Sequence, residues 1–226
     1  NAASAGTETA GVAFGGSPPA GGANNDTQEY NGTDWSEGNN LNTGRYAIGG
    51  SGTQTAALAA GGSPPGNTGS NLSEEYNGTN WTEGNNLGTA RYKTTQFGLQ
   101  TAAVAAGGDT GPANVNNVEH YDGTSWTAAT VYPSTLTFAA SAGSQTDGLV
   151  FLGDLGPGYG ATTNTYDGTS WAASATLANA GGNTEGDGTG ALALAASGGP
   201  SSGRTDGSEE FTGATTALNY KSLSSS

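Results

Sequence analysis

The sequence predicts an all-β fold, and specifically a five-bladed β-propeller built from four-stranded antiparallel blades. The first observation is a six-residue phrase, YNGTDW at 30–35, which recurs as YNGTNW at 76–81 and YDGTSW at 121–126 and 166–171, with a degraded copy, FTGATT, at 211–216. The second is the period, because the aromatic residue that opens each phrase stands at positions 30, 76, 121, 166 and 211. The third is a short run of small apolar residues before each phrase. Repeats of about 45 residues with four short strands each are typical of propellers rather than sandwiches.

The repeats fill the chain as a single domain, 1–226, with blades at approximately 1–44, 45–90, 91–135, 136–180 and 181–226. In each blade we expect four strands, named a, b, c and d in chain order. Strand a is polar and alternating, as in RYAIGGSGT at 45–53 and RYKTTQFGL at 91–99, and residues 1–7 supply it in the first blade. We expect the last strand d within 215–226, so that the ring closes without a strand exchanged between the first and last blades. The alternative is that SLSSS at 222–226 pairs elsewhere or continues into a further domain.

Strand b is a short apolar run bounded by turn residues, which is typical of a strand buried on both faces. The five runs are GVAFGG (11–16), AALAAGG (56–62), AAVAAGG (102–108), GLVFLGD (148–154) and ALALAASGG (191–199). Alanine and glycine dominate them, as a narrow axis crowded by strands requires. A ring of five blades has a tighter axis than a ring of six or seven, so this composition favours five.

Strands c and d form a hairpin around the repeated phrase, with strand c ending at Tyr76 and strand d beginning at Trp81 in the second copy. Asn77-Gly78 is a preferred pair for a two-residue type I′ turn, because both central residues of that turn need positive φ. The aromatic residues at the two ends of the phrase are expected to anchor each blade against its neighbour. The predicted repeat core is therefore Tyr30, Trp35, Tyr76, Trp81, Tyr121, Trp126, Tyr166, Trp171 and Phe211.

These features, taken in order, resemble the kelch repeat: a glycine pair closing the second strand, then a tyrosine, a tryptophan and an arginine near the start of the next blade. The same pattern is seen in galactose-oxidase-like propellers. The resemblance covers Gly15 to Phe211, although the period is shorter than the roughly 50 residues of a kelch repeat and the Tyr-to-Trp spacing is tighter. The glycine-, alanine- and asparagine-rich texture is similar to kelch-like repeats in virion and tail-fibre proteins of marine bacteriophages.

Composition argues against several classes of partner. The 226 residues include 5 Lys plus Arg and 19 Asp plus Glu, which gives a net charge of −14, and the basic residues are scattered. Nucleic acids and anionic membranes are bound by clusters of Lys and Arg, so neither partner is expected. The chain has no Cys, which excludes disulfides and thiolate metal sites. No apolar run approaches the roughly 20 residues of a membrane span.

Binding residues are predicted on one face of the ring. The a–b and c–d turns share one face, called here the turn face, and the b–c and d–a loops share the other, the loop face. The b–c loops (17–28, 63–73, 109–117, 154–164 and 200–208) and the d–a loops (36–44, 82–90 and 127–136) differ from blade to blade. Variable surface loops often carry binding residues, although neutral drift predicts the same variation. Tyr132 and Tyr159 break the repeat symmetry and are the first ligand-binding candidates, followed by Asn24, Asn25, Asn39, Asn85 and Asn116.

No catalytic or metal-binding constellation stands out, and no cofactor is expected. Galactose-oxidase chemistry needs copper held by tyrosines and histidines with a Tyr–Cys crosslink, and a chain with His120 as its single histidine and no Cys cannot supply it. A glycosidase working through two carboxylates is not excluded. The acidic residues before the phrase are interpreted as solvated strand edges: Glu29, Glu74, Glu75, Glu119, Glu209 and Glu210.

These observations predict a structural or binding module rather than an enzyme. The expected setting is extracellular, on a virion surface or tail fibre, where the loop face contacts host glycans or other virion proteins. The alternative is a secreted or cell-surface bacterial adhesion module of the lectin kind. A carboxylate-dependent glycosidase is the third hypothesis.

Overall fold

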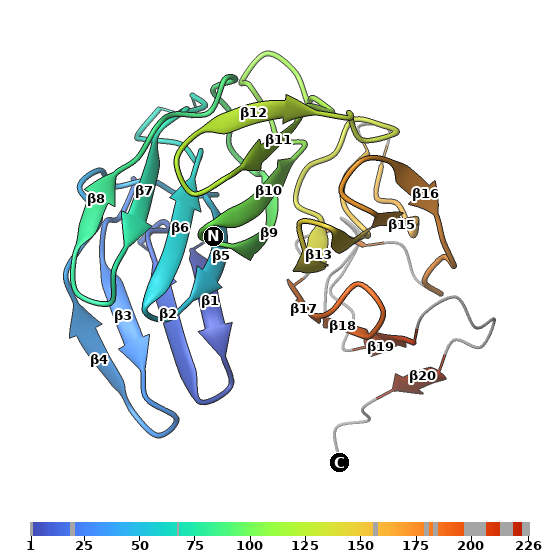
Figure 1. Ribbon diagram of the computed structural model, residues 1–226, viewed down its shortest axis with the longest axis horizontal. Helices are drawn as coiled ribbons and strands as arrows, with labels where there is room; N and C mark the ends of the chain where they lie inside the picture. Colours follow the sequence, from blue (N-terminus) through green and yellow to red (C-terminus); the bar gives the residue numbers. More distant parts are fainter. Residues whose placement is uncertain are drawn as a thin grey trace.

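The chain forms a five-bladed β-propeller of antiparallel sheets (Figure 1). The computed structural model describes residues 2–18, 21–66, 68–155, 158–178, 181–182, 185–196, 207–212 and 219–222. All of its named elements are strands. The first strands of successive sheets lie side by side around the axis, in the order β1, β5, β9, β13 and β17, whereas β17 and β1 are not packed against each other. Among the described residues there is no helix of the length and apolarity that a membrane crossing requires.

Each sheet lies within one repeat segment, and its four strands pair in chain order. Blade 1 contains β1 (Ala3–Thr7), β2 (Ala10–Phe14), β3 (Thr27–Tyr30) and β4 (Trp35–Gly38). Blade 2 contains β5 (Gly49–Thr53), β6 (Ala56–Ala60), β7 (Ser73–Tyr76) and β8 (Trp81–Glu83). Blade 3 contains β9 (Thr95–Leu99), β10 (Ala102–Ala106), β11 (Val118–Tyr121) and β12 (Trp126–Ala129). Blade 4 contains β13 (Ala140–Ser144), β14 (Asp147–Phe151), β15 (Thr163–Tyr166) and β16 (Trp171–Ala173), and blade 5 contains β17 (Glu185–Gly188), β18 (Ala193–Ala196), β19 (Gly207–Phe211) and β20 (Asn219–Ser222).

Strand b is buried on both faces in blades 2, 3 and 4, as its composition predicts, whereas Leu194 in strand b of blade 5 is 43% exposed. In β6, Ala57, Leu58, Ala59 and Ala60 are all fully buried. Alternate residues of a strand point to opposite faces of its sheet, so both faces of this strand contact neighbouring blades. The small side chains allow this close packing around the axis.

Strand a begins later than the sequence predicts. β5 starts at Gly49 and β9 at Thr95, four residues after the expected starts at 45 and 91. Ala47 has a φ of 50° and Lys93 a φ of 58°, which lie in the left-handed region and are incompatible with a strand. The chain therefore turns at these positions on its way from the d–a loop to the axis.

The c–d hairpin differs from the predicted type I′ turn. Tyr76 pairs with Trp81, and within the loop between them only Gly78 has a positive φ, of 84°. The Asn77 side-chain oxygen accepts hydrogen bonds from the backbone N–H groups of Thr79 (3.0 Å) and Asn80 (2.8 Å). Positive φ at the first central residue alone is the mark of a type II′ turn. The asparagine therefore caps the loop with its side chain instead of adopting positive φ.

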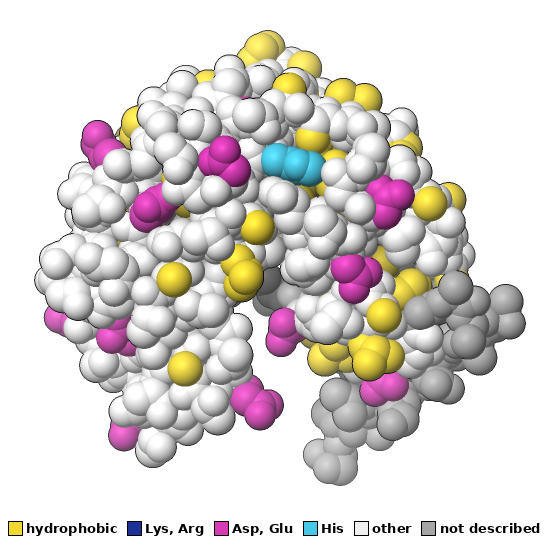
Figure 2. All heavy atoms as spheres, viewed as in Figure 1, with side chains coloured by type: hydrophobic (Ala, Val, Ile, Leu, Met, Phe, Trp, Pro, Cys, Tyr) yellow, Lys and Arg dark blue, Asp and Glu magenta, His cyan; other side chains and the backbone are white. Residues whose placement is uncertain are grey.

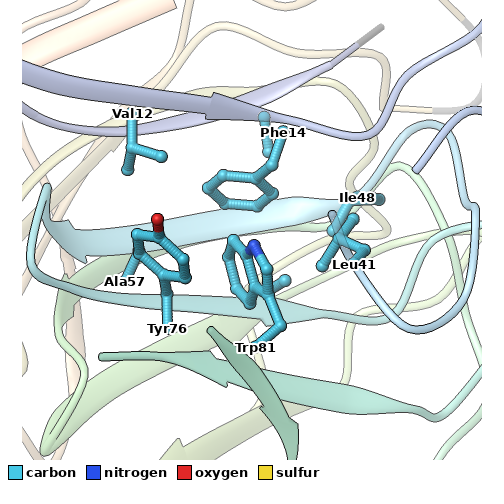
Figure 3. Packing of buried hydrophobic residues seen from close by; sticks show 9 residues of the cluster. Val12, Phe14, Leu41, Ile48, Ala57, Tyr76 and Trp81 are labelled. Atoms are coloured by element: carbon cyan, nitrogen blue, oxygen red, sulfur yellow. The ribbon is translucent and has the colours of Figure 1, made fainter. Parts of the chain in front are cut away.

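The repeated aromatic residues join neighbouring blades, as predicted for the repeat core. Tyr76 and Trp81 of blade 2 pack against Val12 and Phe14 of blade 1 (Figure 3). The Phe14 and Trp81 ring centroids lie 4.8 Å apart in an edge-to-face arrangement, and the Trp81 indole N–H donates to Thr27 Oγ1 at 3.0 Å. Tyr121 and Tyr166 are likewise buried, and Trp126, Trp171 and Phe211 pack against buried clusters.

Blade 1 is the exception to this packing. Trp35 is 56% exposed, whereas its counterpart Trp81 is 5% exposed, and Tyr30 is only half-buried. The assignment of Trp35 to the core is therefore wrong. The reason is geometric, because each tryptophan packs on the preceding blade, and Trp35 has no such blade against it among the described residues.

Buried ion pairs connect two of the d–a loops to the blade that follows them. Arg45 and Glu74 are both buried and lie 2.9 Å apart, and Arg91 and Glu119 repeat the pair at 3.0 Å. Burial lowers the pKa of both arginines, and their glutamate partners act in the opposite direction. The interpretation of Glu74 and Glu119 as solvated strand edges is therefore wrong. Charges buried this deeply need a partner, and the arginines supply it.

Blade 4 replaces this ion pair with uncharged groups. Leu136 stands at the position of Arg91, and Asn164 stands at the position of Glu119. The Asn164 side-chain amide donates to Tyr132 Oη at 2.7 Å. The charge pair and its neutral substitute thus occupy equivalent sites in adjacent blades.

Candidate functional site

Tyr132, the first predicted ligand contact, belongs to the core. Its side chain is fully buried and its ring packs edge-to-face on Trp171, with centroids 4.9 Å apart. Burial raises the pKa of Tyr132 to about 12. The loop position is as predicted, but a fully buried side chain cannot contact a ligand at the surface, so the assignment is corrected.

Tyr159 remains at the loop face. It is half-buried, and its backbone forms an isolated bridge with Asp154. Its ring lies against Gly182, where a side-chain Cβ would collide with it. The absence of a side chain at Gly182 therefore leaves space for the Tyr159 ring. No described contact brings Tyr159 together with the other predicted candidates.

The five asparagine candidates have structural partners. Some hold the b–c loop to the d–a loop of the same blade, others tie a d–a loop to the hairpin of the next blade, and one hydrogen-bonds within its own loop. The acceptors are Asp26 Oδ2 for Asn24 (2.8 Å), Leu41 O for Asn25 (3.2 Å), Thr79 O for Asn39 (2.9 Å), Thr124 O for Asn85 (2.9 Å) and Tyr132 O for Asn116 (3.1 Å). The structure thus places them on the loops as braces and does not gather them into one site.

A hollow of the loop face lies on the propeller axis. It is a cavity of about 210 Å³ where the inner strands begin, and its walls come from all five blades. Because strand a follows the d–a loop in each blade, the beginnings of these strands belong to the loop face. The lining includes Ala3, Ser4, Gly49, Gly50, Thr94, Thr95, Gln96, Ala140, Ser141 and Gly186.

Three left-handed residues frame this cavity. Ala47, Lys93 and Phe138 occupy equivalent positions in blades 2, 3 and 4 and have φ values of 50°, 58° and 52°. The Lys93 N–H donates to Ala47 O at 2.8 Å, and the Phe138 N–H donates to Lys93 O at 3.3 Å. A chain of backbone hydrogen bonds therefore links three blades around the mouth. Non-glycine residues in this region cost of order 1–3 kcal/mol each, and such strain clusters at functional sites.

Two buried polar groups of blade 3 face the cavity without a protein partner. Thr94 is 9% exposed and Gln96 is 8% exposed, and neither Thr94 Oγ1 nor Gln96 Oε1 has a hydrogen-bond partner. The amide nitrogen of Gln96 is held by Ser51 Oγ at 2.8 Å, which fixes the side chain. Gly49 leaves both oxygens open, because a Cβ there would lie 2.7 Å from Gln96 Oε1 and 2.9 Å from Thr94 Oγ1. A buried acceptor without a partner is costly, so these oxygens favour a hydrogen-bond donor in the cavity.

Lys93 lies at the rim of the axial cavity, and its positive charge is paired with Asp109. Its ammonium group lies 3.0 Å from Asp109 Oδ2 and 4.7 Å from the centre of the Tyr92 ring. Burial acts to lower the pKa of Lys93, but the hydrogen bond and charge of Asp109 outweigh it and the pKa is raised. For Asp109, burial acts to raise the pKa, but the Gly111 N–H and Lys93 outweigh it and the pKa is lowered. The pair is thus ionised at neutral pH, and the cavity receives little net charge.

Catalytic machinery is not evident in the part of the chain that the structure describes. The cavity lining contains no carboxylate and no histidine, and no group of three metal-binding side chains occurs among the described residues. His120 lies 2.9 Å from Tyr166 Oη, and burial lowers the pKa of its imidazole. It therefore serves the interface between blades 3 and 4.

The charge distribution agrees with the composition. On the face shown in Figure 2, acidic side chains are scattered over the blades, and no Lys or Arg side chain is visible outside the grey atoms. Two of the five basic residues, Arg45 and Arg91, are fully buried. The face shown in Figure 2 therefore presents no visible cluster of the Lys and Arg side chains that bind polyanions.

Sequence reasoning missed the axial residues. Their signal lies in the departures of blade 3 from its neighbours, since Lys93, Thr94 and Gln96 stand where blade 2 has Ala47, Ile48 and Gly50. Polar side chains on an inner strand otherwise made of small residues are the trace that an axial site leaves in the sequence.

Neither protein-family models nor curated proteins give a match to this chain.

Proposed function

We propose that the chain is a non-enzymatic binding module of a virion surface or tail fibre, which contacts host glycans or other virion proteins through its loop face. The observation that carries this proposal is the axial cavity, with Gln96 Oε1 and Thr94 Oγ1 open to it. The virion setting rests on the resemblance of the repeats to kelch-like repeats of phage structural proteins.

The chemistry of the cavity favours a neutral ligand rich in hydroxyl groups. Its two open oxygens accept hydrogen bonds from O–H or N–H donors. Lys93 is paired with Asp109, so the rim offers an anion little attraction, and the lining has no carboxylate to hold a cation. A sugar residue at the end of a glycan supplies hydroxyl donors without charge, and a pre-formed concave site with a few fixed polar groups is the usual form of a small-ligand site.

The rest of the molecule supports a rigid platform. Carboxylates that a glycosidase would need are engaged elsewhere: Glu74 and Glu119 in buried ion pairs, and Glu29 and Glu75 as acceptors for Tyr76 and Tyr121 of the next blades. Their contacts join blades. This arrangement supports a structural role for the acidic residues and a binding role for the loop face.

The test compares glycan-array binding of the wild-type protein with two cavity variants. Gly49→Ala places a methyl group beside both open oxygens without a positive φ at that residue, and Thr94→Val removes one oxygen while keeping the shape. Thr55→Val, at an exposed site on the turn face, is the matched control. We expect at least a tenfold loss of signal for Gly49→Ala and unchanged binding for the control.

Two results would count against the proposal. Binding that survives Gly49→Ala and Thr94→Val in a folded protein would remove the cavity from the function. Steady hydrolysis of chromogenic glycosides by the wild-type protein would favour the glycosidase hypothesis instead.

A further inference from the structure

The interfaces of blades 1 and 2, 2 and 3, and 3 and 4 share one set of contacts. The hydroxyl of each repeat tyrosine reaches the residue before the aromatic position of the preceding blade: Tyr76 donates to Glu29, Tyr121 donates to Glu75, and Tyr166 pairs with His120. The partner of the tyrosine therefore always lies in strand c of the preceding blade. The same rule predicts the partner of the repeat tyrosine at an interface between blades 5 and 1.

A glutamine in the a–b turn adds two hydrogen bonds to each of these interfaces. The Gln54 amide donates to Gly11 O (3.2 Å) and Tyr30 O (2.7 Å) of blade 1. Gln100 and Gln145 repeat the same pair of contacts on blades 2 and 3. At the equivalent position of blade 1 the chain has Glu8.

One apolar residue of strand b completes the set. Val12, Leu58, Val104 and Leu149 occupy equivalent positions in blades 1 to 4, and each is covered by the tyrosine or phenylalanine of the next blade and almost fully buried. The equivalent residue of blade 5, Leu194, is 43% exposed. Blade 5 therefore presents the apolar half of an interface with nothing described against it.

Blade 1 presents the aromatic half of such an interface. Trp35 is 56% exposed and Tyr30 half-buried, and both stand where the other blades contact their predecessor. Trp35 and Leu194 both line one cavity of about 510 Å³, to which all five blades contribute residues. Figure 2 shows this opening between the two blades, at the lower edge of the view. The exposed apolar residue of blade 5 and the exposed aromatic residues of blade 1 thus border the same opening within one chain.

We propose that blade 5 and blade 1 form a closable seam, in which Trp35 docks on Leu194 and the Tyr30 hydroxyl donates to Glu210 of the same chain. The pairing follows the rule of the other interfaces, because Glu210 precedes Phe211 as Glu29 precedes Tyr30. Both halves belong to one chain and share a cavity, so their effective concentration favours closure within the chain over pairing with a second copy. The seam is independent of the binding function proposed above.

Glu8 makes this seam weaker than the three interfaces that contain the glutamine. A carboxylate is acceptor-only, so Glu8 cannot donate to the two carbonyl groups that Gln54, Gln100 and Gln145 bond in their interfaces. Closing the seam would direct a charged acceptor toward backbone carbonyls. The seam therefore lacks the two hydrogen bonds that the glutamines give the interfaces of blades 1 and 2, 2 and 3, and 3 and 4.

The test uses protein labelled with 5-fluorotryptophan, in which Trp35 gives its own fluorine resonance, assigned with Trp35→Phe. Glu8→Gln supplies the missing amide, and we expect it to raise the ratio of closed to open molecules by about two- to tenfold, the range of one hydrogen bond. The readout is the protection of the Trp35 resonance from solvent. Glu83→Gln, an exposed glutamate of blade 2, removes the same charge away from the seam and should leave the ratio unchanged.

Leu194→Asp tests the apolar contact from the other side. It should expose Trp35 fully, whereas Leu99→Asp, at a leucine of blade 3 that is also exposed, should not. Trp35 that stays solvent-exposed in both the wild-type and Glu8→Gln proteins would overturn the proposal. So would protection of Trp35 that grows with protein concentration together with dimers in sedimentation velocity, because the partner would then be a second copy.

Discussion

Replacing Arg91 by leucine should be among the most damaging single changes in this propeller. The guanidinium is fully buried and donates to Gly107 O (2.8 Å), Asn117 O (2.7 Å) and Glu119 Oε1 (3.0 Å). Arg91→Leu leaves Glu119 buried, with only the backbone N–H groups of the d–a loop as donors. Removing one partner of a buried ion pair costs about 3–5 kcal/mol, so we expect a loss of this size in the free energy of unfolding.

Blade 4 indicates how the loss is compensated. There the equivalent positions hold Leu136, Asn164 and Tyr132 in place of Arg91, Glu119 and Leu87. The triple variant Arg91→Leu, Glu119→Asn, Leu87→Tyr copies this neutral set into blade 3. We expect it to recover most of the stability, to within about 1.5 kcal/mol of wild type, because replacing a buried pair by well-packed uncharged groups is often nearly neutral.

Urea unfolding followed by tryptophan fluorescence and circular dichroism measures all the variants. The intermediate Arg91→Leu, Glu119→Asn variant separates the removal of the stranded charge from the gain of the Tyr hydroxyl. A cost below about 1 kcal/mol for Arg91→Leu would refute the reasoning. A triple variant no more stable than the single variant would refute the equivalence of the two sets.

Three further predictions concern the fold. Gly52→Ala, at a φ of 104° with Ala56 O in the path of the new Cβ, should lower the melting temperature, with the strained φ alone costing about 1–3 kcal/mol; a melting temperature equal to wild type would contradict it. Trp81→Ala should cost about 3–5 kcal/mol in urea unfolding, since the ring fills the interface between blades 1 and 2. Because burial raises the pKa of Tyr132 to about 12 from its ordinary value of 10.0, the folded state holds this proton longer than the unfolded state. The free energy of unfolding should therefore be highest below about pH 10 and fall as the pH rises toward 12. Urea unfolding at each pH measures this fall, which should be shallower in Tyr132→Phe, and absorbance at 295 nm follows the ionisation of tyrosine.

The repeated phrase and the apolar runs before it were sufficient to predict the number of blades, the strand order and the burial of strand b in blades 2, 3 and 4. Local details depended on side-chain chemistry that the period does not contain. Asn77 supports its hairpin by accepting backbone hydrogen bonds, so a turn expected from the Asn-Gly pair alone became a turn with glycine first. Glu74 and Glu119 looked like edge residues because their arginine partners are nearly 30 residues away in the sequence.

The candidate site was harder to predict than the fold. Tyr132 lies in a variable loop, as expected, but the loop folds inward and the ring fills the space of a leucine in other blades. Thr94 and Gln96 were overlooked because nothing in a repeat pattern marks which strand-a residues meet at the axis. Their polarity, against the small residues of the other inner strands, is the signal that the sequence contains.

The loop face can be tested most directly by blocking each face of one blade in turn. Because the chain has no cysteine, Thr68→Cys on a b–c loop and Thr55→Cys on an a–b turn each accept a single bulky polyethylene glycol maleimide at an exposed threonine of blade 2. The measurement is binding of each conjugate to the glycan or virion protein that wild type binds. The account predicts that the Thr68 conjugate loses binding and the Thr55 conjugate keeps it. Loss from the Thr55 conjugate alone would place the contact on the turn face and contradict the account.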